Sequence, residues 1–166
     1  MKTRSAIICG GRNFSEIDYP GVRKFLKDFL ESQNVTEEIC GMAIGADMFG
    51  MDIAEHMGIK VNKFYADWDM TIPEFKDDPK SIAYNPSGEY SRPYNKLAGI
   101  NRNKRMAKYA KNNRGICIAL PGGRGTQDMI KQAKENEIPV YVLSVKTIHT
   151  GETHSKDVNE YEFIRS

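Results

Sequence analysis

The most constraining feature of the sequence is a short apolar run that ends in a glycine-rich turn and continues as a helical pattern. Residues 116–120 have the pattern of a buried strand, Pro121 and three glycines follow, and helical spacing begins at Thr126. Glycine lets backbone amides come close to a ligand, and a helix N-terminus behind such a turn offers unpaired N–H groups to an anion. The segment predicts a strand–turn–helix unit that either binds phosphate or only reverses the chain.

Strand-like and helix-like segments alternate along the rest of the chain. Strands are predicted over residues 5–9, 38–40, 60–65, 114–120 and 139–144, and helices over residues 20–32, 46–57, 101–111 and 126–136. This alternation favours right-handed βαβ units around a parallel sheet covered on both faces. We therefore expect an α/β fold with a mainly parallel sheet of about five strands.

The chain is long enough for one domain with a full core, and we place that domain at residues 1–145. Residues 69–94 form a polar, proline-containing insertion that is a candidate lid, with a disordered segment as the alternative. Residues 146–166 are a polar C-terminal tail, which we expect to pack over the domain or to mediate assembly.

Composition excludes several classes of function. The net charge of +2 does not by itself indicate nucleic acid or membrane as a partner. The chain has no apolar run of about 20 residues that could span a membrane, and its three histidines have no metal-site spacing. The three cysteines lie in apolar segments, which indicates reduced thiols and a cytoplasmic location. We expect no metal and no cofactor.

Chemically distinctive residues follow four of the predicted strands. Ligands of parallel α/β sheets bind at the carboxyl ends of the strands, so we expect these residues to share one edge. The candidate ligand-binding residues at these strand ends are Gly10, Gly11, Arg12, Gly41, Gly45, Asp47, Asp67, Trp68, Gly122, Gly123, Arg124, Gly125 and Thr126.

The arginines are the candidates for phosphate. Arg12, Arg102 and Arg124 can each make forked hydrogen bonds to phosphate oxygens, although a single arginine is more often a solvated surface charge. Trp68 follows the third strand, where it can stack on a base or simply pack.

Two aspartates have an ambiguous position. Asp47 and Asp128 lie in the first turns of predicted helices, where a carboxylate stabilises the helix dipole without any other role. The functional alternatives are binding of ribose hydroxyls and assistance to a leaving group.

The third predicted helix carries a basic stripe made of Lys104, Arg105, Lys108 and Lys111. We favour a solvated helix face for this stripe over a contact with nucleic acid.

Five sequence blocks occur in an order that resembles the SLOG superfamily, named for its Smf/DprA and Lonely Guy members. The chain is most similar to the small single-domain branch found in bacteria and phages. The resemblance implies a Rossmann-like three-layer sandwich that binds a nucleotide or nucleotide-derived ligand and forms dimers or higher assemblies. The blocks are CGGRNF at 9–14, GMAIGADMFGMDIAE at 41–55, YADW at 65–68, AGINRNKRMA at 98–107 and PGGRGTQDM at 121–129.

The Lonely Guy enzymes are phosphoribohydrolases with the pattern PGGxGTxxE and an upstream Arg-Lys pair. Arg102 matches that arginine, but Asn103 replaces the lysine and Met129 occupies the acidic position. Asp128 lies one residue earlier, so the candidate catalytic residues are Asp128 and Arg102. Another departure is Met42, which stands where the family often has a second glycine.

Three functions follow from these residues. We expect binding of a nucleotide-derived small molecule, with Asn103 among the ligand contacts. The alternatives are a nucleoside monophosphate N-glycosidase and, less favoured, a DNA-binding accessory.

The helix at 46–57 is apolar around most of its circumference, so we also expect a second subunit to cover it, with the C-terminal tail as the alternative cover.

Overall fold

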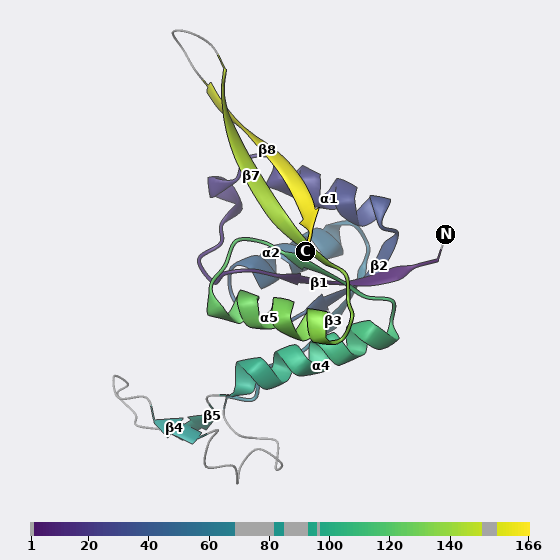
Figure 1. Cartoon of the computed structure of the whole chain (residues 1–166), viewed down its shortest axis with the longest axis vertical. Helices are drawn as coiled ribbons and strands as arrows, with labels where there is room; N and C mark the ends of the chain where they lie inside the picture. Colours follow the sequence, from purple (N-terminus) through teal and green to yellow (C-terminus); the bar gives the residue numbers. More distant parts are fainter. Residues whose placement is uncertain (1, 69–81, 85–92, 96, 151–155) are drawn as a thin grey trace.

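The computed structural model describes residues 2–68, 82–84, 93–95, 97–150 and 156–166. Its main sheet has six strands in the order β3-β2-β1-β6-β7-β8 (Figure 1). The first five of these are parallel to one another, and β8 runs antiparallel to β7. The strands are β1 (Arg4–Cys9), β2 (Val35–Cys40), β3 (Lys60–Lys63), β6 (Ile116–Ala119), β7 (Val140–Thr150) and β8 (Lys156–Arg165).

Helices cover both faces of this sheet, which makes three layers. Helices α1 (Val22–Ser32) and α2 (Ala46–His56) pack on one face, and α4 (Ala98–Asn112) and α5 (Arg124–Glu135) pack on the other (Figure 1). The predicted α/β sandwich with a mainly parallel sheet is confirmed, with six strands in place of about five.

Strand β1 shows why the sheet is buried on both sides. Its side chains alternate between the two faces, so Ala6 and Ile8 join the core under α1 and α2. Ile7 and Cys9 join the core under α4 and α5. A strand between two helical layers reads as a continuous apolar run, which is the pattern seen in the sequence.

The sixth strand comes from the segment that we treated as a polar tail. Strand β7 runs on to Thr150, and β8 returns beside it as a long hairpin that extends away from the body of the domain (Figure 1). Phe163 of β8 lies 4.4 Å from Phe29 and 5.2 Å from Phe25 between ring centroids. The tail therefore packs over α1, and its outward-facing charged residues account for its polar composition.

Only small parts of the candidate lid at residues 69–94 are described. They are β4 (Ile82–Tyr84) and part of β5 (Pro93–Asn95), which pair as a two-stranded antiparallel sheet. The rest of the candidate lid lies outside the described residues.

None of the helices in the described ranges combines the length and the apolar character needed to cross a membrane.

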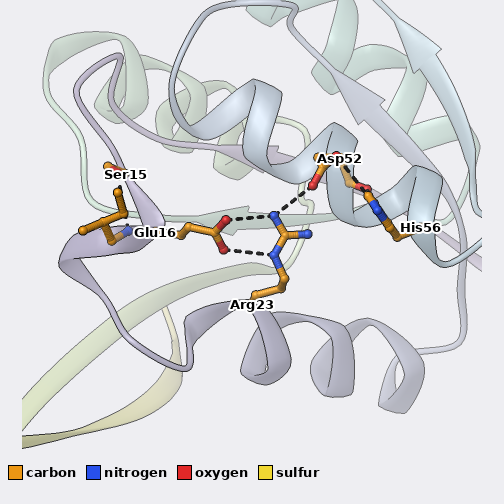
Figure 2. A network of polar contacts seen from close by, with 6 residues as sticks. Ser15, Glu16, Arg23, Asp52 and His56 are labelled. Atoms are coloured by element: carbon orange, nitrogen blue, oxygen red, sulfur yellow. Dashed lines mark hydrogen bonds and ion pairs between the residues drawn. The ribbon is translucent and has the colours of Figure 1, made fainter.

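An arginine ties the loop after β1 to both helices of its layer. Figure 2 shows the Arg23 guanidinium of α1 between the carboxylates of Glu16 and Asp52. Its Nε and Nη2 donate to Glu16 at 2.9 and 3.0 Å, and Nη2 lies 2.8 Å from an Asp52 oxygen. Glu16 belongs to the short 3-10 helix η1 (Glu16–Asp18), so this network anchors the loop that begins with Gly10.

Candidate ligand cavity

A cavity of about 470 Å³ opens at the carboxyl edge of the sheet. The loops after β1 and β2 and the first turns of α4 and α5 form its walls. Its volume is in the range of small-molecule sites in proteins, about 300–1,000 Å³. Thirteen residues singled out from the sequence line it: Gly10, Gly11, Arg12, Gly41, Asp47, Trp68, Arg102, Asn103, Gly123, Arg124, Gly125, Thr126 and Asp128.

Two predicted ligand-binding glycines have a different place. Gly45 and Gly122 do not line this cavity, because their backbones pack against the turn formed by residues 10–12. A Cβ on Gly122 would lie 2.6 Å from the Gly11 nitrogen, and one on Gly45, whose φ is +81°, would contact the Gly11 and Arg12 carbonyls. These glycines let three loops meet, and hydrogen bonds from Gly11 N to Pro121 O and from Ala46 N to Gly11 O hold the loops together.

The N-terminus of α5 forms one end of the cavity. Gly123 caps the helix, and a Cβ at this position would meet no atom within 4 Å. The Thr126 side chain is 5 % exposed, and its hydroxyl has no hydrogen-bond partner in the part of the chain that the structure describes. The first amides of a helix also lack intrahelical partners. The first backbone amides of α5 therefore lie beside the open space at Gly123, whereas the unpaired Thr126 hydroxyl is buried.

Three arginines from three elements face the same cavity. Arg12 follows β1, Arg102 lies in α4 and Arg124 begins α5. None of them has a carboxylate within 4.0 Å among the described residues. Asp47 lies near Arg102 without forming an ion pair, so three guanidinium groups surround one cavity without a paired carboxylate in the described part of the chain, which favours an anion there.

Arg102 and Asp47 lie close together at the back of the cavity without forming an ion pair. Arg102 Nη1 donates to the Gly41 carbonyl at 2.9 Å, while its buried Nε has no partner among the described groups. Burial lowers the pKa of Arg102, and the nearby Arg12 charge lowers it further. Burial likewise raises the pKa of Asp47, against the opposing effects of the Ala43 amide and the two arginines.

The residues that depart from the family pattern have different surroundings. Asn103, in the place of the lysine, donates from Nδ2 to Asp128 Oδ2 at 2.9 Å, and Gln132 donates to the other Asp128 oxygen at 3.4 Å. Met129, in the acidic position, is 1 % exposed and packs in the core under α4 and α5. Met42, in the place of a glycine, has φ +61°, so the loop keeps a backbone conformation that favours glycine.

The sequence analysis did not identify every residue of the cavity wall. Asp67 does not line the cavity. Gly99 and Ile100 do, because α4 begins at Ala98 and not at the predicted residue 101. The remaining unpredicted wall residues are Cys9, Ala43, Met106 and Met129. No group of metal-ligating side chains is arranged for a metal ion anywhere in the described ranges.

Comparison with known proteins yields one informative similarity. No family model matches the sequence, and no curated protein matches it. Among solved structures, the chain is similar to DNA processing protein A (DprA) from Streptococcus pneumoniae, with a TM-score of 0.52 and 19% sequence identity. The match covers 84% of this chain and 50% of the DprA chain, so this chain spans about half the length of its structural relative. At this identity the similarity shows a shared fold.

Proposed function

We propose that this protein binds a nucleotide, or a phosphorylated molecule derived from one, in the cavity at the carboxyl edge of the sheet. The observation that carries the proposal is the convergence of Arg12, Arg102 and Arg124 on the open N-terminus of α5. Guanidinium groups and the amides of a helix N-terminus are both common partners of phosphate in proteins. Asp128, fixed by Asn103, can accept a hydrogen bond from a ribose hydroxyl.

We further propose that the chain belongs to the SLOG superfamily and works in the cytoplasm. The fold similarity to DprA supports the first point, as does the position of the matched sequence blocks around the cavity. The three cysteines are free and buried, which suits a reducing compartment.

The test is calorimetric titration with adenosine and adenosine 5′-monophosphate. The monophosphate should bind more tightly, and Arg124→Ala should weaken its binding by about 1.5–3 kcal/mol, the value of a hydrogen bond to a charged group. Adenosine binding should change much less. The matched control is Lys131→Ala, which removes an exposed cation from the same helix without touching the cavity. Equal affinities for the two compounds, or equal losses in the two variants, would contradict the proposal.

A second candidate function is hydrolysis of the N-glycosidic bond of a nucleoside monophosphate. The specific observation is that Asp128 lines the cavity with its carboxylate held by two amide side chains. Cleavage of glycosidic bonds normally needs a carboxyl group near the bond. Chromatography of wild-type incubations should detect little or no free base. Rapid release that Asp128→Asn abolishes would establish the hydrolase and displace the binding function.

A further inference from the structure

Two smaller cavities adjoin the ligand cavity and share walls with it. The first, here called the β3-side cavity, has a volume of about 300 Å³ and lies over the ends of β2 and β3, where Ile44, Tyr65 and Trp68 line it. The second, the β6-side cavity, has a volume of about 340 Å³ and lies over the ends of β1 and β6, where Asn13, Phe14 and Tyr19 line it.

Arg12 connects these spaces, because it lines all three cavities. The β3-side cavity also shares Trp68 and Arg102 with the ligand cavity, and the β6-side cavity shares Gly11 and Gly123. The carboxyl edge of the sheet therefore carries one extended groove, with its cationic groups in the middle and an aromatic region at each end.

The two end regions are suited to flat rings. Tyr65 is 62 % exposed and Trp68 is 37 % exposed, although large aromatic side chains are usually covered. At the other end, Tyr19 is partly buried and stacks on the core residue Phe14, which is 9 % exposed, with ring centroids 5.3 Å apart and planes 6° apart. Tyr19 is therefore the ring at this end on which a nucleobase can stack.

The ligand cavity alone is large enough for the single sugar, phosphate and base of a mononucleotide. A mononucleotide would therefore leave at least one aromatic end empty. We infer that the ligand is a compound with two bases joined through phosphates, with its phosphates at the three arginines and one base at each end of the groove. This inference rests on the proposed function, because it takes the arginines to bind phosphate.

The test compares three adenine compounds by calorimetry: adenosine 5′-monophosphate, ADP-ribose and diadenosine diphosphate. ADP-ribose and diadenosine diphosphate share the diphosphate and both riboses, and only the latter has a second base. We expect diadenosine diphosphate to bind at least about tenfold more tightly than ADP-ribose, the order of one stacked base. Equal affinities would overturn the inference and leave the proposed function standing. Failure of all three to bind would overturn both.

Single variants at the two ends locate the bases. Tyr65→Ala changes only the β3-side cavity, and Tyr19→Ala changes only the β6-side cavity. Each should weaken binding of diadenosine diphosphate by roughly fivefold or more, whereas only one of them should weaken binding of the monophosphate. Because Tyr19 is partly buried, Asn13→Ala serves as a second variant at its end. The control is Ile17→Ala, which removes an exposed apolar side chain that lines none of the three cavities.

A short single-stranded oligonucleotide, such as hexadeoxyadenylate, distinguishes a small ligand from a nucleic acid. It should bind no more tightly than diadenosine diphosphate. Affinity that rises steadily with oligonucleotide length would overturn the inference, because the groove would then belong to a continuous nucleic-acid surface. Unchanged affinity for diadenosine diphosphate in both folded end variants would also overturn it.

Discussion

Glu38 is buried in the middle of β2, and its protonation should make the stability of the protein depend on pH. It is 1 % exposed, and neither carboxyl oxygen has a hydrogen-bond partner among the described residues. Burial, together with the nearby charges of Asp47 and Glu55, raises the pKa of Glu38 to about 9. Glu38 is therefore neutral in the folded protein at pH 7 and ionised in the unfolded chain.

The sign of the effect follows from proton binding. Between the ordinary pKa of 4.5 and the folded value of about 9, the folded state holds one proton more than the unfolded state. The free energy of unfolding should therefore fall as the pH rises, by about 1.4 kcal/mol per pH unit. From pH 5 to pH 8 this amounts to roughly 4 kcal/mol, which is a large share of the stability of an ordinary domain.

Glu38→Gln isolates this contribution, because glutamine has the shape of the protonated acid but does not titrate. Urea unfolding across pH 5–8 should show wild-type stability falling relative to Glu38→Gln as the pH rises, so that the variant is the more stable protein at pH 8. Glu162→Gln, which removes an exposed carboxylate from β8, is the control. If the difference between wild type and Glu38→Gln were the same at every pH, the buried carboxyl would not titrate as argued.

Three further predictions follow from packing. Gly123→Val should fold normally and lose nucleotide affinity in calorimetry, because its side chain would enter the cavity. Gly122→Val should instead lower the melting temperature in thermal unfolding, because a Cβ there meets the Gly11 backbone. A lower melting temperature for Gly123→Val and an unchanged one for Gly122→Val would refute this assignment. Light scattering should give at least twice the 18.8 kDa chain mass, because methionines of α2 are only half-buried within one chain; a monomer would remove the case for a second subunit. The three thiols of Cys9, Cys40 and Cys117 are buried. At pH 8, iodoacetamide should therefore alkylate them far more slowly in the native protein than in urea. Fast labelling of the native protein would show that the thiols are exposed.

Much of the fold could be predicted because each element carries its own signal. The spacing of Val22, Leu26 and Leu30 identifies α1, and these three residues are its buried ones. The parallel sheet then places strand ends at one edge, which is why turns far apart in the sequence could be assigned to one cavity. Gly10 and Gly123 illustrate this, since they lie on different strand–helix units and line the same space.

What could not be predicted depends on contacts between distant segments. A sequence does not distinguish a glycine that lines a cavity from one that makes room for another loop, so it could not indicate that Gly45 packs against the Gly11 and Arg12 carbonyls while Gly123 lines the ligand cavity. Strand β8 alternates charged with aromatic residues, but its inward face becomes evident only when Phe163 meets Phe29. The hydrogen bond between Asn103 and Asp128 joins two helices, and neither residue indicates the other in the sequence.

The strand order also affects how the chain reaches its native state. Strand β1 lies at the centre of the sheet, where Ala6 pairs with Ile116 of β6. Pairing Ala6 with Ile116 closes a long loop of the chain. Loop closure costs conformational entropy before any contact compensates for it, and this slows folding. A chain in which β1, β2 and β3 paired before β6 would expose β1 as an unpaired edge strand, which is prone to aggregation. The residues that line the cavity come from segments on both sides of the β1–β6 pair. A ligand therefore stabilises only the completed domain and does not stabilise the β1–β2–β3 part before β6 has paired.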